Sequence, residues 1–142
     1  MKTSMTKASL AAALFASGMA GPLSTAAAQA PGFLLQTDKS VLGEPLQLPP
    51  SGAAEVLASI VTLQPGETTP LHRHGTPMFA YILEGEVTVN YGDAGQRTYP
   101  QGAALMEAMS VPHAGTNTGD RPVKILTVYF GPKGATPVLL GR

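Results

Sequence analysis

The stretch HRHGTPMFAYILEGE, residues 72–86, places two metal-binding side chains directly before an apolar strand. Side chains alternate between faces along a β-strand, so His72 and His74 are predicted to share one face and Arg73 the other. Met78 follows His74 by four residues, an even number, and therefore lies on the histidine face if the strand continues without a break. Two imidazoles arranged in this way can reach one metal ion at about 2.0–2.1 Å. The stretch therefore predicts a strand that carries half of a metal site.

The sequence on either side of this stretch predicts further antiparallel strands. EVLASIVTL (55–63), EVTVN (86–90) and VKILTVYF (123–130) are apolar or alternating runs, and Gly, Pro, Asn and Asp separate the runs at turn positions. The Glu84-Gly85-Glu86 turn suits a hairpin. No helical period extends over a useful length. These features predict an all-β fold, an antiparallel sandwich or barrel.

The N-terminal third of the chain is predicted to lie outside this barrel. Residues 1–30 have the layout of a secretory signal peptide, with two lysines, an apolar stretch and a small-residue end at STAAAQA. The apolar stretch is too short for a membrane anchor. We expect cleavage after Ala28 or Ala30, and hence a periplasmic or secreted protein. Residues 31–53 are rich in Pro and Gly and predict an arm with one or two short edge strands, and residues 54–142 form the barrel domain.

Charge and cysteine content exclude several partner classes. The chain has nine basic and nine acidic residues, and Lys2 and Lys7 lie in the leader, so the remainder carries a formal charge of −2. This balance favours neither nucleic acid nor an anionic membrane as a partner. Without cysteine the chain has no disulfide, thiolate ligand or thiolate nucleophile. Packing, and a metal ion if one binds, must stabilise the exported domain.

The spacing around the paired histidines resembles the first motif of the cupin family. Gly66, five residues, His72-Arg73-His74, three residues, Met78, six residues and Gly85 follow the pattern G-x5-H-x-H-x3/4-E-x6-G. The one departure in chemistry is Met78, which stands where the family has glutamate. The resemblance implies a β-barrel of the antiparallel, double-sheet, jelly-roll-like type.

A second motif of the same family follows in the expected order. Gly102, five residues, Ala108-Met109-Ser110, two residues, His113, three residues and Asn117 resemble G-x5-P-x-G-x2-H-x3-N. Ala108 and Ser110 replace the proline and glycine of the family's turn, which affects its shape more than its chemistry. The resemblance thus covers residues 66–117.

In cupins the two histidines and glutamate of the first motif and the histidine of the second bind one metal ion. The resemblance therefore implies His72, His74 and His113 as metal ligands, with Met78 at the fourth position. The chain has only these three histidines, and all three match the motifs. This favours a metal site over hydrogen-bonded core histidines in a barrel that has lost its metal.

Three roles remain open for Met78. It packs in the barrel, because methionine fills irregular apolar gaps; or its sulfur binds the ion, which favours copper, particularly Cu(I); or the site is degenerate and holds no ion. Met106 and Met109 are predicted to flank the approach to His113, which suggests a copper environment. Iron, copper, manganese, nickel and zinc all remain candidates.

Few polar residues other than the histidines suggest a catalytic or binding role. Glu107 could face the cavity as a base, although an exposed strand glutamate is the preferred interpretation. Ser59 and Ser110 lack the histidine and carboxylate partners of a nucleophile. Arg73 is predicted to form a surface ion pair, and Asn117 to satisfy backbone groups near a turn.

Two functions follow from these residues and the resemblance. The first is an exported metal-binding cupin that acts as a small-molecule oxygenase, as thiol and diketone dioxygenases of this family do, with open metal positions for dioxygen or substrate. The second is a non-catalytic protein that binds copper or a small ligand. The resemblance also suggests a homodimer in which residues 31–53 exchange between subunits.

Overall fold

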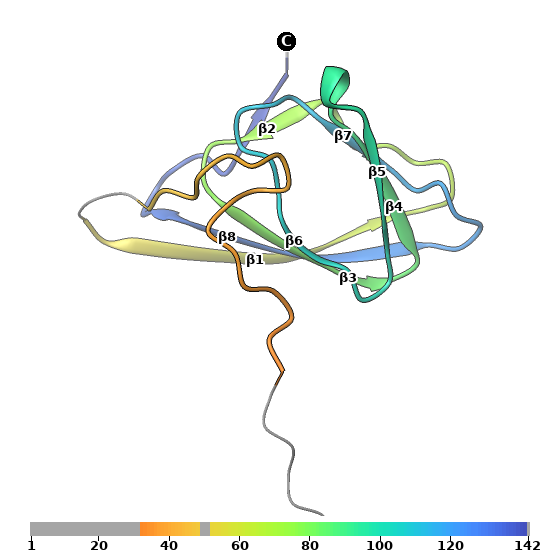
Figure 1. The fold of residues 1–142 in the computed structure, drawn as a ribbon, viewed down its shortest axis with the longest axis horizontal. Helices are drawn as coiled ribbons and strands as arrows, with labels where there is room; N and C mark the ends of the chain where they lie inside the picture. The colour runs from red at the N-terminus through yellow and green to blue at the C-terminus, as the bar shows by residue number, and fades with distance from the viewer. Residues whose placement is uncertain (1–31, 49–51, 142) are drawn as a thin grey trace, which may run out of the picture. The chain divides into compact units, whose positions relative to one another are not determined.

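The computed structural model of the chain describes residues 32–48 and 52–141. These residues form nine strands and one turn of 3-10 helix (Figure 1). The predicted signal peptide falls outside the described residues. No helix in the described part of the chain has the length and apolarity to cross a membrane. The elements are β1 (Ala54–Leu63), β2 (His72–His74), β3 (Met78–Glu84), β4 (Glu86–Asn90), η1 (Gly92–Ala94), β5 (Gln96–Pro100), β6 (Ala104–Met106), β7 (Ala114–Thr116), β8 (Val123–Pro132) and β9 (Val138–Leu140).

One wall of the domain is a four-stranded antiparallel sheet in the order β1-β8-β3-β6. Its two long strands, β1 and β8, pair along their full ten residues, from Ala54 opposite Pro132 to Leu63 opposite Val123. Both strands are runs of β-branched and apolar residues, which suit a pleated sheet. β3 pairs with β8 and β6 and completes the wall.

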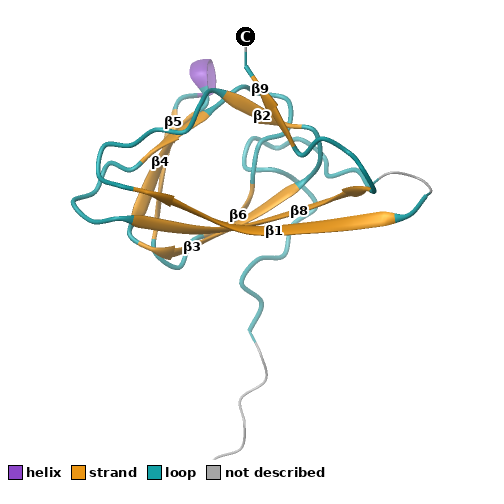
Figure 2. Cartoon of the chain, turned by 180° about the vertical axis from the view of Figure 1, so that it is seen from behind, coloured by secondary structure: helices purple, strands orange, loops and turns teal. Residues whose placement is uncertain are grey.

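The remaining strands form the opposite side, in a three-stranded sheet β5-β4-β7 and a two-stranded sheet β2-β9. In Figures 1 and 2, β1, β8, β3 and β6 lie on one side, and β2 and β9 lie opposite. Side chains from both sides meet in a core that includes Ile82, Val87, Tyr91 and Val123. The predicted all-β, antiparallel, double-sheet barrel is confirmed.

The predicted hairpin at Gly85 is wrong. β3 and β4 flank this residue but belong to different sheets. Gly85 has a φ of 72°, and a Cβ atom there would lie 2.8 Å from the carbonyl oxygen of Pro122. Glycine is therefore required at this corner, where the chain crosses from one sheet to the other.

The paired histidines and Met78 do not lie on one continuous strand. β2 ends at His74 and pairs with β9, whereas β3 begins at Met78 and pairs with β6 and β8. A Cβ atom on Gly75 would collide with the carbonyl oxygen of Thr136, so the chain approaches the β8–β9 connection closely at the break. The alternation of side chains along a strand nevertheless predicts their burial correctly, since His74 and Met78 are buried and Arg73 is exposed.

The arm packs on the barrel with less regular structure than predicted. In residues 32–48 the expected edge strands are reduced to one β-bridge between Lys39 and Pro45. The arm continues past the end of β6, where the Val41 N–H donates to the Met106 carbonyl oxygen at 2.9 Å. Val41 also packs against the core.

Candidate metal centre

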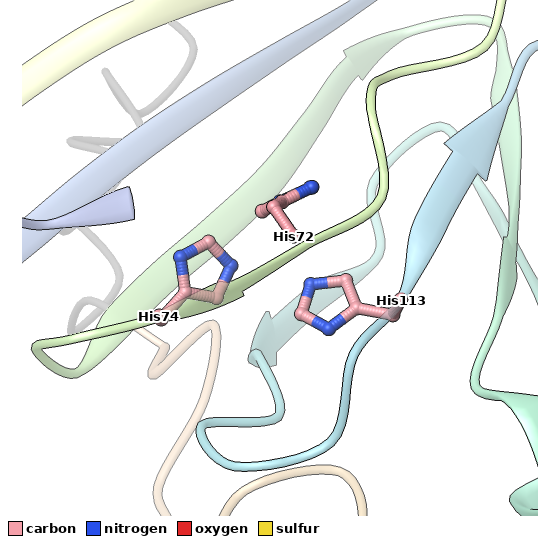
Figure 3. A group of neighbouring side chains, drawn as sticks. All are labelled: His72, His74 and His113. Carbon is pink, nitrogen blue, oxygen red and sulfur yellow. The ribbon is translucent and has the colours of Figure 1, made fainter. Parts of the chain in front are cut away.

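The three histidines converge on one point inside the barrel (Figure 3). His72 and His74 lie on β2, and His113 directly precedes β7. The backbones of His72 and His113 form a β-bridge, with reciprocal hydrogen bonds of 3.0 and 2.8 Å. Their ring centroids are 4.7 Å apart, and each lies 5.1 Å from the ring of His74. One short backbone bridge therefore joins the two halves of the sequence pattern.

Backbone carbonyl groups orient two of the three imidazoles. Nδ1 of His72 lies 2.7 Å from the carbonyl oxygen of Pro70, and Nδ1 of His113 lies 2.9 Å from that of Val111. A carbonyl oxygen only accepts, so both rings carry their proton on Nδ1. The Nε2 lone pair is then free to bind an ion. Such a hydrogen bond to the remote nitrogen is the usual support of a metal-binding histidine.

The histidine wall contains buried nitrogens that make no hydrogen bond. They are Nε2 of His113 and both ring nitrogens of His74. A buried polar atom without a partner costs about 1–3 kcal/mol. Of the two His74 nitrogens, one carries the proton and the other a lone pair. Nε2 of His113 and one nitrogen of His74 therefore present lone pairs that no group among the described residues satisfies. A metal ion fits this requirement, because it binds the imidazole lone pairs.

Burial keeps the His72 and His74 rings neutral. Burial, together with neighbouring His113 and His72, lowers the pKa of His74 to about 3, although the Pro137 carbonyl oxygen offsets part of the decrease. Burial is also the main cause that lowers the pKa of His72. Neutral imidazole is the form that binds metal, so the site is ready for an ion near neutral pH.

The geometry is close to that of a bound site. The ligand nitrogens all lie within 4.8 Å of one another. Bonds of about 2.0–2.1 Å in tetrahedral geometry separate such nitrogens by about 3.3 Å. The three nitrogens are therefore near one ion's reach and must draw somewhat closer together to bind it.

Met78 lines the same cavity and is 6% exposed. It packs with Ala80 and Leu105 in the smaller core cluster. Among the described residues, Met106 and Met109 do not line the cavity, and their expected position beside the approach to His113 stays a prediction. Binding of the ion by the Met78 sulfur stays a prediction.

Glu107 lies inside the barrel, so the expectation of an exposed glutamate is wrong. It is 5% exposed, follows directly after β6 and lines the histidine cavity. Its Oε1 accepts hydrogen bonds from the Tyr91 hydroxyl at 2.7 Å and the Ala108 N–H at 2.8 Å. The Tyr91 and Tyr99 hydroxyl groups are 3.0 Å apart. The sequence suggested no role for these tyrosines, because tyrosine is common in strands and only folding brings them to Glu107.

The cavity between these groups has a volume of about 90 Å³. Val61, Leu63, Ile82 and other apolar side chains form most of its lining. Burial, followed by the charge of Glu107, raises the pKa of Tyr91, so its hydroxyl stays protonated and donates to the carboxylate.

The contacts of Asn117 and Arg73, two polar residues outside the cavity, can be compared with the roles predicted for them. Asn117 satisfies backbone groups as expected, since its Nδ2 donates to the carbonyl oxygens of Leu63 and Arg121 at 2.9 and 2.8 Å. The predicted ion pair of Arg73 is wrong. The ion pairs among the described residues are Arg121–Asp120 and Lys124–Glu84.

The turn before His113 is held by the arm. Oε2 of Glu44 accepts the Met109 N–H at 2.7 Å, and Oε1 accepts the Ser110 N–H at 2.8 Å. Ser40 donates to the same carboxylate at 2.8 Å. The arm thus secures the loop in which the sequence departs from the motif, a role that sequence spacing did not reveal.

Comparison with known proteins agrees with this geometry. The cupin domain model matches residues 59–129, half of the chain. The chain is a cupin. No curated protein matches this cupin.

Solved structures show the same fold. The polyketide cyclase RemF from Streptomyces resistomycificus is 23% identical, with a TM-score of 0.53 over 69% of each chain. Oxalate decarboxylase from Lactobacillus farciminis, in a formate complex, is 24% identical, with a TM-score of 0.52. That match covers 60% of this cupin and only 26% of the decarboxylase chain. At this identity the two structures support the fold alone.

Proposed function

We propose that this protein is an exported metal-binding cupin that acts on a small molecule as an oxygenase. The observation that supports it is the group of buried imidazole nitrogens without hydrogen-bond partners, which face one cavity. His72, His74 and His113 would hold the ion. When bound, the ion supplies Lewis acidity and open positions for a small molecule.

The protein's own groups support a site for a ligand as well as for an ion. The mostly apolar lining lowers the local dielectric constant, which strengthens polar contacts within the cavity. Glu107 and Tyr99 offer polar groups beside the histidines. Three protein ligands leave room for a further one, which is typical of catalytic metal sites rather than closed structural ones.

Elemental analysis of protein purified from its native exported compartment tests the metal assignment. We expect about one transition-metal ion for each chain, lost on chelation and restored on addition of metal. Dioxygen uptake with small organic substrates then tests the oxygenase assignment. Protein that contains no transition metal and takes up none would contradict the proposal.

The alternative function is non-catalytic binding of copper or of a small ligand. The burial of Met78 in the cavity favours it, because a thioether beside imidazoles suits Cu(I). Copper as the native metal, together with no substrate turnover, would favour this alternative.

Export is part of the same proposal. The lysines, apolar stretch and STAAAQA end of residues 1–30 support a cleaved signal peptide and a periplasmic or secreted protein. Intact-mass measurement should place the mature N-terminus at Gln29 or Pro31. Retention of Met1 in exported protein would contradict cleavage.

We also propose a homodimer, in which a second copy covers the outer face of the four-stranded sheet. β1 and β8 are apolar on both faces, a pattern typical of strands buried on both sides. Within one chain, Val56 and Ile60 of the outer face are each 60% exposed. Strand pairing places the following apolar residues together on this face: Val56, Ala58, Ile60, Leu126, Val128, Phe130, Phe79, Tyr81, Ala104 and Met106.

The size and charge of this outer face suit a second copy of the chain. The four strands are ten, ten, seven and three residues long and about 4.8 Å apart, which gives a footprint of roughly 500 Å². An exposed apolar patch of this size is often functional. The Lys124–Glu84 ion pair lies at one end of the face, where a polar rim is expected. Two such sheets can pack face to face about a two-fold axis.

Light scattering tests the dimer. The unchanged protein should be dimeric, and Ile60→Glu should yield a folded monomer. Leu140→Glu is the matched control, because Leu140 is 70% exposed but lies on β9, outside this face. A monomeric wild type would overturn the dimer and leave the metal assignment untouched.

A further inference from the structure

Glu107 places a carboxyl group that accepts two hydrogen bonds inside the metal cavity. The Tyr91 hydroxyl and the Ala108 N–H hold Oε1, and the Glu107 N–H donates to the Met78 carbonyl oxygen at 2.9 Å. Both the backbone and the side chain of Glu107 are therefore positioned by hydrogen bonds. A buried carboxylate with such support is a built feature of the cavity rather than a chance surface group.

Among the described residues, no lysine or arginine side chain pairs with Glu107 inside the cavity. The described residues that line it include neither arginine nor lysine. Arg97 lies over the Tyr91 ring at 5.9 Å and donates to the Val41 carbonyl oxygen, while its own side chain is at the exposed surface. The charges in the cavity are thus Glu107 and the ion when it is bound.

Glu107 is separate from the set of metal ligands. The group of mutually close ligand atoms contains the three histidines and not the Glu107 carboxylate. Glu107 nevertheless lines the same cavity as the three histidines. A molecule bound beside the ion would therefore meet the carboxylate as a second contact.

We propose that Glu107 selects the ligand of this cavity, favouring neutral molecules that carry a hydroxyl or N–H donor over anions of the same size. This inference rests on the proposed function, since it concerns the small molecule bound at the same site. An ionised carboxylate accepts hydrogen bonds and donates none. It stabilises a donor group, and it repels a second carboxylate in a cavity of low dielectric constant. A bound metal ion attracts anions, and Glu107 reduces that attraction.

Acetate and acetamide form a matched pair of probes, because they have nearly the same shape and differ in charge and in N–H donors. Their dissociation constants would be measured on Co(II)-loaded protein from changes in its visible absorption. The quantity of interest is the ratio of acetate affinity to acetamide affinity. A change in this ratio between variants cancels the intrinsic preference of the ion.

Glu107→Gln tests the role of the charge. Glutamine retains an oxygen that can accept from Tyr91 and Ala108, so the pocket keeps its shape. We expect the acetate-to-acetamide ratio to rise at least tenfold. Glu86→Gln, at the start of β4 and outside the cavity, changes the net charge equally and should leave the ratio within about twofold.

A second variant covers the case in which Glu107→Gln does not fold. Tyr91→Phe combined with Glu107→Leu removes the carboxylate together with the hydroxyl that donates to it, which costs less than removing one of the two alone, and only the Ala108 N–H loses its acceptor. The same rise of at least tenfold is expected. Tyr91→Phe alone retains the charge and should change the ratio by less than about threefold.

The outcomes separate this inference from the proposed function. A ratio unchanged on removal of the Glu107 charge would overturn the role of Glu107, while the metal site would stand. Loaded protein that binds neither probe would contradict a ligand-binding centre altogether, and with it the inference.

Discussion

Two walls of one cavity differ in how their polar atoms are satisfied. On the histidine wall, both nitrogens of His74 and Nε2 of His113 lack hydrogen-bond partners. On a second wall, beside the first because the Tyr91 ring lies 5.6 Å from that of His113, Oε1 of Glu107 has two donors, and the Tyr91 hydroxyl contacts both Glu107 and Tyr99. The first wall is incomplete without a ligand, and the second is complete within the protein. The comparison suggests that the first wall binds the ion and the second shapes what binds beside it.

The largest expected effect comes from removing a ligand on the histidine wall. His72→Ala, His74→Ala and His113→Ala should each weaken Zn(II) binding at least a hundredfold, because each removes one of three protein ligands. Titration against a competing chelator measures the affinity. Full metal occupancy in all three variants would show that metal binds elsewhere.

A substitution on the second wall should lower the stability of the fold and leave metal affinity nearly unchanged. Tyr91→Phe removes the hydrogen bond to a buried carboxylate and should lower the free energy of unfolding by about 1.5–3 kcal/mol. Zn(II) affinity should change by less than about threefold. Urea unfolding of the metal-free protein measures the change in the free energy of unfolding, and the chelator titration measures the change in Zn(II) affinity. A loss of metal affinity as large as that of His74→Ala would remove the distinction between the walls.

Met78 belongs to the cavity, and its variants decide which role it has. If its sulfur binds the ion, Met78→Leu should weaken Cu(I) strongly and Zn(II) little, while packing changes by less than about 1.5 kcal/mol. If Met78 only packs, the affinities for both ions should stay nearly unchanged. In that case Met78→Glu should restore the family's fourth ligand and favour Mn(II) or Fe(II).

The smallest expected effect concerns the loop that leads to His113. Burial raises the pKa of Glu44, but hydrogen bonds from Met109, Ser110 and Ser40 outweigh it, so the pKa lies below the usual 4.5. A depressed folded-state pKa adds stability above pH 4.5, and this is lost as the pH falls through the folded value.

Glu44→Gln should therefore be less stable than wild type near pH 7, and the difference should shrink below about pH 4.5. Urea unfolding as a function of pH measures it. Glu67→Gln is a control for loss of one carboxylate, since Glu67 interacts locally with the Gln64 N–H. A constant difference between Glu44→Gln and wild type across pH 3–7 would exclude the ionised carboxylate as the stabilising group.

Local sequence patterns were enough to predict most of the strands and the three histidines of the candidate metal site. The period-two apolar runs predicted the strands, because alternation and β-branched residues suit a pleated sheet whatever its partners. Motif spacing identified His72, His74 and His113, and the structure brings them together. These features depend on residues that are near in sequence, or on spacing shared across a family.

Only the tertiary structure decided which segments pair and which groups are buried. The corner at Gly85 depends on Pro122, and the break after His74 depends on the approach of Gly75 to Thr136, contacts that sequence order does not reveal. Glu107 follows a short strand and has no local sign of burial. Its inward position depends on Tyr91 and on the strands around it. The polarity of a side chain is local, whereas its burial is set by the distant parts of the chain that fold over it.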